Sequence, residues 1–369
     1  MRIFIDIGHP AHVHYFKNFI KIMTENGHSF FISARNKEMT HHLLQYLGID
    51  YFNRGKGRVT AIGKLMYLVY ADIAILRKSL FFKPDIFLGF ASFYTAHVAK
   101  ILRKPSIILD DTENGKLQQL FYKPFASLIL SPDCFYKNFG ENHIKFPSYM
   151  ELSYLHPKYF TPDIDVLGEL GVQKDDCYTF CRFVSWNANH DFGHEGLSLK
   201  NKILAVKEFS KFGKVFISSE IKLPKELEKY MVTVSPEKIH SVLYYASLVF
   251  GESATMASES AILGTNSIYI DNEGRGYTDQ LESKYNLVHN FTESNKDQIA
   301  SINKGIHILS DRNLRMKSQK SKNMILSDKI NLTDYLVWLI ENYPKSSDLL
   351  KKKLKTKKDL DNFVFEKYD

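Results

Sequence analysis

The chain has 369 residues, of which 44% are hydrophobic, 14% aromatic and 24% charged, and its formal net charge is +8. This length and composition predict two packed domains and exclude a largely disordered chain. Three cysteines are too few for a disulfide framework and no apolar run is long enough to span a membrane, so we expect a cytoplasmic protein, soluble or peripheral to the inner face of the membrane.

Strands and helices alternate through the first 150 residues. Strands are expected at 3–7, 30–34, 85–89, 106–109 and 128–131, and helices at 15–25, 37–47, 59–79, 94–102 and 117–125. Repeated βα units of this size predict a parallel, doubly wound sheet. In such sheets, ligands bind beyond the carboxyl ends of the strands.

Three prolines close together (Pro147, Pro157 and Pro162) interrupt this pattern, and a second series of βα units follows. Its strands are expected at 178–184, 215–218, 231–234, 247–250 and 267–270, with helices at 199–212, 224–230 and 237–246. We therefore predict an α/β protein of two Rossmann-like, doubly wound parallel-sheet domains facing a cleft. The predicted parts are a first domain over 1–153, a linker over 154–165, a second domain over 166–330, and a helix and basic tail over 331–369 that pack back on the first domain.

The most informative motif is Gly251-Glu-Ser-Ala-Thr-Met-Ala-Ser-Glu259, between a buried strand and a helix. A turn of small residues there presents backbone N–H groups and a helix N-terminus to a diphosphate. Glu259 would lie one to two helical turns further on, within reach of a ribose. The alternative is an ordinary strand–helix turn. The turn residues are Ser253, Ala254, Thr255 and Met256.

A second motif, Gly8-His-Pro-Ala-His-Val-His14, directly follows the first strand. A histidine at the carboxyl end of a strand can act as a general base or bind phosphate. We select His12 as the catalytic residue and place His9 and His14 on the acceptor side. The alternative is that one histidine caps the helix and the others are merely exposed.

A third motif is Asp110-Asp-Thr-Glu-Asn114, after the strand at 106–109. Acidic and amide side chains at a strand end suit hydrogen bonding to sugar hydroxyls. We select Glu113 as a second catalytic residue and place Asn114 on the acceptor side. Capping of the following helix is the alternative reading.

Two further segments hold candidate donor-binding residues. Arg182, at the end of the strand 178–184, can pair bidentately with a diphosphate. Asp279 and Gln280 follow the strand 267–270 and can hydrogen-bond a hexose, with a loop cap as the alternative. His190 and His194 have a spacing that binds zinc on a helix, but the intervening glycine favours a loop, and we predict no metal.

Other ligand classes lack their motifs. No Gly-x4-Gly-Lys-Ser/Thr loop occurs, and no Gly-x-Gly-x-x-Gly follows the first strand, which argues against a P-loop enzyme and a dinucleotide oxidoreductase. The positive charge suits nucleic acid, anionic lipid or phosphorylated substrates. No aromatic and basic ribbon of the RNA-binding type is evident, so we expect no nucleic acid partner.

Together these motifs resemble a GT-B fold glycosyltransferase, namely the N-acetylglucosaminyltransferase that forms lipid II. Its Ser-Gly-Ala-Leu-Thr-Val-Ser-Glu is similar to Glu252-Ser-Ala-Thr-Met-Ala-Ser-Glu259, and its Glu-Gln-Asn is similar to Thr112-Glu-Asn114. Its Gly-Gly-His-Val-Phe-Pro corresponds to Pro10-Ala-His-Val-His-Tyr15, and its Asp-x-Gln-Gln falls near Asp279-Gln280. The resemblance implies that Glu259 holds the ribose, that the turn before it cradles the diphosphate, and that His12 faces the acceptor.

The chain resembles more closely a family of archaeal and bacterial GT-B-like proteins whose domain has no assigned function. Members carry an early Gly-His-Pro-Ala-His and a Trp-x-Ala-x-His-Asp segment, here Gly8–His12 and Trp186–Asp191. Non-hydrolysing UDP-N-acetylglucosamine 2-epimerases share the fold. Their Gly-Gly-x-x-Glu-Glu motif matches less well, because Ser258-Glu259 lacks the second glutamate.

These resemblances imply a metal-independent glycosyltransferase without a cofactor. It would move a sugar from a nucleotide-sugar, with UDP favoured by analogy, to a polysaccharide, glycan or lipid-linked acceptor in cell-surface glycan biosynthesis. The alternatives are a UDP-sugar 2-epimerase and a non-catalytic sugar-nucleotide binding protein. The segment 59–82, with its apolar residues and cations, is expected either to lie on an anionic membrane surface or to pack on the sheet.

Overall fold

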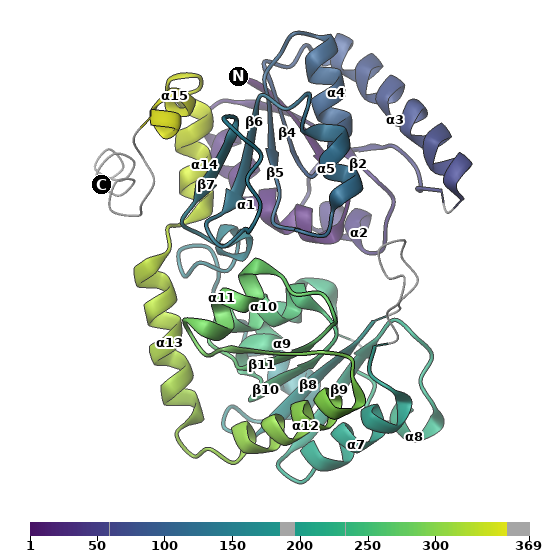
Figure 1. The fold of residues 1–369 in the computed structure, drawn as a ribbon, viewed down its shortest axis with the longest axis vertical. Coiled ribbons are helices and arrows are strands. Elements are labelled where there is room, and N and C mark those ends of the chain that lie inside the picture. Colours follow the sequence, from purple (N-terminus) through teal and green to yellow (C-terminus); the bar gives the residue numbers. More distant parts are fainter. Residues whose placement is uncertain (59, 185–195, 233, 353–369) are drawn as a thin grey trace. The chain divides into compact units, whose positions relative to one another are not determined.

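The computed structural model describes residues 1–58, 60–184, 196–232 and 234–352 (Figure 1). The chain forms two compact units, one of which receives residues from both ends of the sequence. Unit 1 combines residues 1–154 with the chain from Lys329 onward, and unit 2 consists of Leu155–Asp328.

Unit 1 is built on a seven-stranded sheet in which every neighbouring pair of strands is parallel. The strand order is β3-β2-β1-β4-β5-β6-β7. The strands are β1 (Arg2–Ile7), β2 (Ser29–Ala34), β3 (Phe52–Asn53), β4 (Ile86–Phe90), β5 (Ser106–Leu109), β6 (Leu128–Pro132) and β7 (His143–Phe146). The central strands are nearly continuous apolar runs because helices cover both faces of the sheet.

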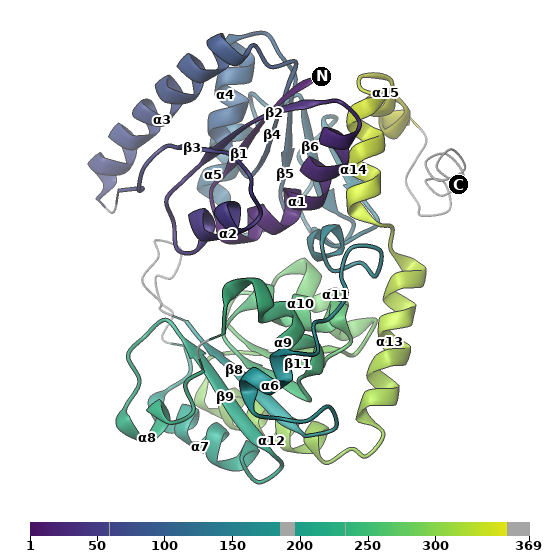
Figure 2. The same ribbon diagram turned by 180° about the vertical axis from the view of Figure 1, so that it is seen from behind.

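Helices α1, α2 and α14 cover one face of this sheet, and α3, α4 and α5 cover the other (Figures 1 and 2). On the second face, Phe4 and Phe87 of the sheet pack with Ile75 of α3 and Val98 of α4. The helices are α1 (Pro10–Glu25), α2 (Thr40–Tyr46), α3 (Ala61–Phe82), α4 (Phe93–Ile101), α5 (Lys116–Tyr122), the 3-10 helix η1 (Met150–Ser153), α14 (Leu332–Glu341) and α15 (Lys345–Lys352).

The C-terminal segment completes unit 1. Lys329 Nζ lies 2.6 Å from a carboxylate oxygen of Asp133, where the chain re-enters the unit. Helix α14 then packs on α1, and Asn26 Nδ2 donates a 2.8 Å hydrogen bond to Glu341. Almost every side chain of α14 is buried, which fits its strongly apolar sequence.

Unit 2 is built on a five-stranded parallel sheet in the order β12-β11-β10-β8-β9. The strands are β8 (Tyr178–Phe183), β9 (Lys214–Ser219), β10 (Leu248–Gly251), β11 (Ser267–Ile270) and β12 (Val288–Phe291). The helices are α6 (Val166–Leu170), α7 (Leu199–Phe209), α8 (Lys225–Glu228), the 3-10 helix η2 (Pro236–Lys238), α9 (Ile239–Tyr245), α10 (Ala254–Leu263), α11 (Gly276–Ser283), α12 (Asn295–Leu309) and α13 (Leu314–Asp328).

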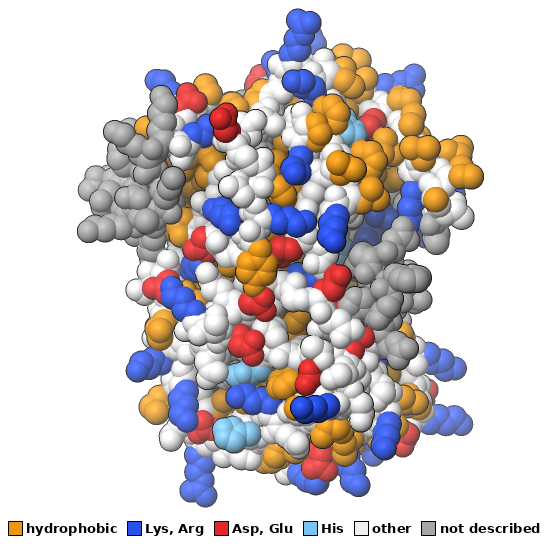
Figure 3. Space-filling model, in the orientation of Figure 1, with side chains coloured by type: hydrophobic (Ala, Val, Ile, Leu, Met, Phe, Trp, Pro, Cys, Tyr) orange, Lys and Arg blue, Asp and Glu red, His pale blue; other side chains and the backbone are white. Residues whose placement is uncertain are grey.

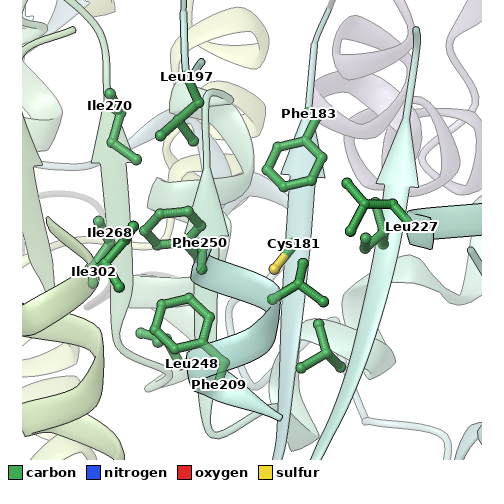
Figure 4. Close-up of a cluster of buried hydrophobic side chains, with 14 of the residues drawn as sticks. Cys181, Phe183, Leu197, Phe209, Leu227, Leu248, Phe250, Ile268, Ile270 and Ile302 are labelled. Carbon is green, nitrogen blue, oxygen red and sulfur yellow. The ribbon is translucent and has the colours of Figure 1, made fainter. Parts of the chain in front are cut away.

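One hydrophobic core cluster of unit 2 lies between the sheet and helices α7 and α12. Phe209 of α7 and Ile302 of α12 pack on Leu248, Phe250 and Ile268 of the sheet (Figure 4). The rings of Phe209 and Phe250 meet edge to face with centroids 5.1 Å apart, a geometry that aromatic pairs favour. This core fixes the strand ends from which the loops of the candidate site emerge.

Several local predictions differ from the structure. The first helix begins at Pro10 rather than residue 15, because His9 Nδ1 caps it by accepting from the Ala11 N–H at 3.2 Å and proline suits the first helical position. The expected strand at 231–234 is reduced, among the residues described there, to a single bridge between Met231 and Ile217. Residues 155–165, predicted as a linker, belong to unit 2, where the Asp163 N–H donates to Ser241 at 3.0 Å.

Each sheet has one point at which the strand order reverses. In unit 1 it lies between β1 and β4, and in unit 2 between β8 and β10. Such switch points are where doubly wound sheets bind their ligands, beyond the carboxyl ends of the strands. The histidine motif follows β1 and the Gly251–Glu259 motif follows β10, so both predicted motifs lie at a switch point.

The described part of the chain includes no candidate for a membrane-spanning helix. Within these residues, no helix combines the length and the apolar character that a crossing requires.

Candidate functional site

The turn after β10 is shaped by two small residues. A Cβ added to Gly251 would lie 2.0 Å from the carbonyl oxygen of Arg182 on the neighbouring strand, so only glycine fits there. Ser253 then caps α10, with its hydroxyl accepting from the Met256 N–H at 3.3 Å. The backbone therefore turns sharply into α10 at the switch point of unit 2.

This turn leaves two backbone donors available at the start of α10. The Met256 N–H is not one of them, because it donates a hydrogen bond to the Ser253 hydroxyl. The N–H groups of Ala254 and Thr255 receive no hydrogen-bond partner from the described residues. Two adjacent donors at a helix N-terminus can hold an anionic oxygen.

The predicted ribose ligand, Glu259, lies in the second turn of α10 and is buried. Its Oε1 is 2.9 Å from Nε2 of His240, which comes from α9 and is also buried. A buried carboxylate needs such a partner. The role of Glu259 toward a ribose stays a prediction, and sequence reasoning missed His240.

Arg182 lies at the end of β8 and is bonded toward β9. Its guanidinium donates to the Ser218 hydroxyl at 2.8 Å and forms an ion pair with Glu220. If Arg182 bound a diphosphate, the diphosphate would replace the carboxylate of Glu220 as the partner of the guanidinium. That role stays a prediction.

Glu252 is a buried residue that the sequence analysis did not select. Its two carboxylate oxygens accept from the Val184 N–H at 3.0 Å and the Leu197 N–H at 2.6 Å. The ammonium group of Lys202, also buried, lies 3.4 Å away. Glu252 therefore joins the residues on both sides of the segment 185–195 to the turn after β10.

Asp279 and Gln280 lie in the first turns of α11, after β11. Asp279 Oδ1 accepts from Asn290 Nδ2 at 3.4 Å, and both predicted residues are half-buried. Arg275, at the N-cap of α11, adds a cation that sequence reasoning missed, 3.8 Å from Asp271. The arginine between two glycines in Gly274-Arg-Gly276 was the available signal.

In unit 1, His9 and His12 lie on the first turn of α1. His12 Nδ1 accepts from the Gly8 N–H at 3.2 Å, and its ring packs on Phe90 with centroids 4.8 Å apart. Phe90 ends β4, so this contact spans the switch point of the sheet. His9 caps the helix through Nδ1, which was the alternative reading of the motif.

The surroundings of His12 favour its neutral form. Burial, followed by the nearby His9 and Lys37, lowers the pKa of His12 well below the usual value near 6.5. Because Nδ1 accepts a backbone N–H, the proton of the neutral ring lies on Nε2. In this geometry His12 offers a hydrogen-bond donor rather than a free basic nitrogen.

His14 lies on a different side of α1. It is buried, and its ring stacks on Tyr154 with centroids 5.2 Å apart. The structure thus brings His9 and His12 together but directs His14 to another contact. Its predicted place on the acceptor side remains untested.

The acidic segment after β5 is buried. Asp110 accepts from the Thr112 N–H at 2.9 Å, from Gln119 at 3.2 Å and from the Tyr122 hydroxyl at 2.5 Å. Burial raises the pKa of Asp110 to about 6 although these hydrogen bonds lower it. Burial and the nearby Glu151 raise the pKa of Asp111 well above its usual range.

The two predicted residues of this segment follow directly. Glu113 is buried, and its Oε1 accepts from the Tyr136 N–H at 3.3 Å. Asn114 is half-buried. Their roles toward an acceptor stay predictions.

A buried ion pair at the carboxyl end of the unit 1 sheet was missed by sequence reasoning. Arg54 Nε lies 2.8 Å from Asp6 Oδ1, and each side chain is 2% exposed. Asp6 also accepts from Ser33 at 3.0 Å and from Ser92 at 2.8 Å. Arg54 lies over the ring of Tyr94 at 4.7 Å. This network joins the ends of β1, β2, β3 and β4 beside the histidine motif.

From the sequence we predict no metal site, after weighing a histidine pair. His190 and His194 lie outside the described residues. Among the residues that are described, no group of three or more His, Cys, Asp or Glu side chains is arranged to hold a metal ion.

Two parallel α/β units of this kind, each with its motif at a switch point, define a GT-B fold, which confirms the predicted fold class. The chain belongs to the family described as "Protein of unknown function (DUF354)", whose model matches residues 1–336. It is 26% identical over 300 residues to the uncharacterized protein MJ0665 of Methanocaldococcus jannaschii, covering 78% of this chain and 87% of that protein.

Solved structures with the same fold include two kinds of protein. One is a protein from Listeria monocytogenes assigned as a UDP-N-acetylglucosamine 2-epimerase, with a TM-score of 0.69, 12% identity, and coverage of 94% of this chain and 97% of that chain. Another is the spinosyn rhamnosyltransferase SpnG in complex with thymidine diphosphate, with a TM-score of 0.60, 13% identity, and coverage of 93% and 100%. At these identities the likeness establishes the fold alone.

Proposed function

We propose that this protein is a glycosyltransferase that moves a sugar from a nucleotide-sugar, with UDP the expected nucleotide, to a glycan or lipid-linked acceptor. The donor would bind at the switch point of unit 2 and the acceptor beside the histidine motif of unit 1. The reaction needs three things: a grip on the leaving diphosphate, a contact to the nucleoside, and a group that receives the proton of the acceptor hydroxyl.

The turn from Gly251 to Met256 is the observation that carries this proposal. Two backbone donors, Ala254 N–H and Thr255 N–H, lie at the N-terminus of a helix and at a switch point. Negative charge grows on the diphosphate as the sugar leaves, and preorganised donors stabilise that charge more in the transition state than in the ground state. Spinosyn rhamnosyltransferase, which shares the fold, was solved with thymidine diphosphate, which supports a nucleoside diphosphate as the ligand class.

On the acceptor side, two residues could interact with the acceptor hydroxyl. His12 offers Nε2–H, which suits a hydrogen bond to an acceptor oxygen or a phosphate. For His12 to act as the base, its contact with the Gly8 N–H must first break. Glu113, the second predicted catalytic residue, is the other candidate for accepting the proton of the acceptor hydroxyl.

A proline substitution tests the donor site sharply. Ala254 is the first residue of α10, a position where proline is tolerated. Ala254→Pro therefore removes one backbone N–H while α10 stays intact. Leu199→Pro is a matched control, because Leu199 is also the first residue of a serine-capped helix in unit 2. Thermal unfolding would be followed with UDP, GDP, CDP, CMP, NAD and ATP.

We expect one nucleoside diphosphate to raise the melting temperature, since a ligand at 100 times its Kd stabilises the folded state by about 2.7 kcal/mol. Ala254→Pro should weaken that nucleotide at least tenfold, because a hydrogen bond to a charged group contributes about 1.5–3 kcal/mol. Leu199→Pro should leave the affinity unchanged. If no nucleotide shifts the wild-type protein, the proposal is wrong.

A 2-epimerase is the second candidate. Buried carboxylates of unit 1 favour it, because Asp110 has a pKa raised to about 6 and is suited to proton transfer at a sugar carbon. An epimerase would convert a UDP-sugar without an acceptor, whereas a transferase would consume the donor only when an acceptor is added. Incubation of UDP-N-acetylglucosamine with the protein alone therefore separates the two.

A further inference from the structure

Helix α3 exposes an apolar face along its whole length. Tyr67, Ala71, Ile75 and Ser79, one residue per turn, face inward and are buried. The opposite side carries eight large apolar residues, each at least 50% exposed. These are Ile62, Leu65, Met66, Val69, Tyr70, Ile73, Leu80 and Phe81.

Such a face is unusual for a surface helix, which normally presents polar residues to water. Helices α4 and α5 extend the apolar area with Ile101, Leu117 and Leu120, all more than 60% exposed. In Figure 3, hydrophobic side chains gather over these three helices with Lys and Arg side chains among them. A continuous exposed apolar area of this kind marks a binding surface.

The charges around this face are almost all positive. Residues 56–83 contain six lysines and arginines and one acidic residue, Asp72. That carboxylate lies 2.9 Å from His97 Nδ1. Burial lowers the pKa of His97, but the hydrogen bond to Asp72, the charge of Asp72 and the contact with the Phe121 carbonyl together raise it. The cations lie at both ends of the helix. They are Lys56, Arg58 and Lys64 at one end and Arg77, Lys78 and Lys83 at the other.

We infer that the outer face of α3 docks on an anionic lipid bilayer. The helix would lie flat at the level of the headgroups, with its apolar side chains entering the acyl boundary and its terminal cations on lipid phosphates. A helix of 22 residues is about 33 Å long, so the contact would extend across many lipids.

A second copy of the chain fits this face less well. Because both ends of α3 carry cations, two copies of α3 placed face to face bring cation onto cation in either the parallel or the antiparallel orientation. Like charges facing each other oppose association, whereas an anionic lipid surface complements both ends at once. The charge pattern therefore selects lipid as the occupant.

The test is co-sedimentation of the full chain with vesicles of phosphatidylcholine and phosphatidylglycerol at 7:3 and with vesicles of phosphatidylcholine alone. One variant, Leu65→Gln/Met66→Gln/Val69→Gln, keeps the helix because glutamine is a good helix former. Its matched control, Leu199→Gln/Met316→Gln/Met324→Gln, changes three exposed apolar residues of unit 2. A second pair compares Lys64→Gln/Arg77→Gln/Lys78→Gln with Lys200→Gln/Lys207→Gln/Lys225→Gln.

We expect binding to the anionic vesicles, at least tenfold weaker binding to the neutral ones, and at least a tenfold loss in each α3 variant. Both controls should bind like the wild type. Equal sedimentation with and without vesicles would overturn the inference. So would a wild-type dimer in light scattering that the apolar α3 variant converts to a monomer. The readout does not depend on nucleotide binding, so this inference and the proposed function fail separately.

Discussion

The imidazole of His240 and the carboxylate of Glu259 lie 2.9 Å apart in the interior of unit 2. His240 belongs to α9, which leads into β10, and Glu259 belongs to α10, which leaves it. Their contact joins the two helices on either side of the strand that ends at the candidate donor site. The pair therefore holds the start of α10 in place whether or not Glu259 also contacts a ribose.

This pair should be energetically coupled. His240→Ala and Glu259→Ala should each lower the free energy of unfolding by about 1–3 kcal/mol, because each removes the 2.9 Å hydrogen-bond partner of a buried polar group. The double variant should lose clearly less than the sum. Urea unfolding of the four proteins measures this coupling. The same cycle on the exposed pair Glu208 and Lys211 should give no more than about 0.5 kcal/mol, and equal values for the two cycles would contradict the prediction.

Substitution of His12 separates a donor role from a base role. Glutamine keeps an N–H donor but no basic nitrogen, whereas alanine has neither. If His12 acts through Nε2–H, His12→Gln should retain most of kcat/KM for sugar transfer and His12→Ala should lose about a hundredfold. Equal losses in both variants would instead show that His12 is the base. His307→Gln, an exposed histidine of unit 2, should leave the rate unchanged.

Asp111→Asn should stabilise the protein at neutral pH. The pKa of Asp111 is raised in the folded protein, so the folded state binds more protons than the unfolded state above about pH 4, and stability falls as the pH rises. The amide removes this penalty, with an expected gain of about 1–2 kcal/mol at pH 8 and none near pH 4. Urea unfolding across this range checks it. Asp50→Asn, at an exposed carboxylate, serves as the control, and a gain independent of pH would contradict the prediction.

Loss of Arg54 should strongly destabilise unit 1. Arg54→Met leaves the buried carboxylate of Asp6 without its cation, which costs about 3–5 kcal/mol in comparable sites. Arg2→Met removes an exposed ion pair with Asp85 and should cost less than about 1 kcal/mol. Urea unfolding of both variants tests the contrast. A small effect at Arg54 would mean that water reaches Asp6 in solution.

The parts of the fold that depend on local patterns could be predicted from the sequence. The turn Gly251–Met256 is an example, because an apolar strand, small residues and a helix follow each other directly along the chain. The same holds for the histidine motif, although its helix starts five residues earlier than expected. The boundaries were less predictable. Strand β3 was missed because it has only two residues, and β7 (His-Ile-Lys-Phe) and β12 (Val-His-Asn-Phe) were missed because polar residues interrupt their apolar pattern.

Contacts between distant residues could not be predicted in this way. Asp6 and Arg54 are 48 positions apart, and periodicity does not indicate that they pair. A signal existed, since Asp6 interrupts the apolar strand Ile3–Ile7, and a carboxylate buried on a central strand requires a partner. The buried aspartate therefore predicts that a cation lies nearby, but it does not predict which residue supplies that cation. Glu252 is similar, because its role depends on Val184 and Leu197, which meet it only in the folded unit.

The return of α14 to unit 1 affects the order in which the nascent chain can fold. Unit 2 is continuous in the sequence, so all of it is synthesised before α14. Unit 1 must wait for roughly ten seconds or more of further translation before α14 can cover α1. Until then, part of the apolar surface of unit 1 stays open to chaperones, and a chain that stops after residue 328 contains a complete unit 2 beside an unfinished unit 1.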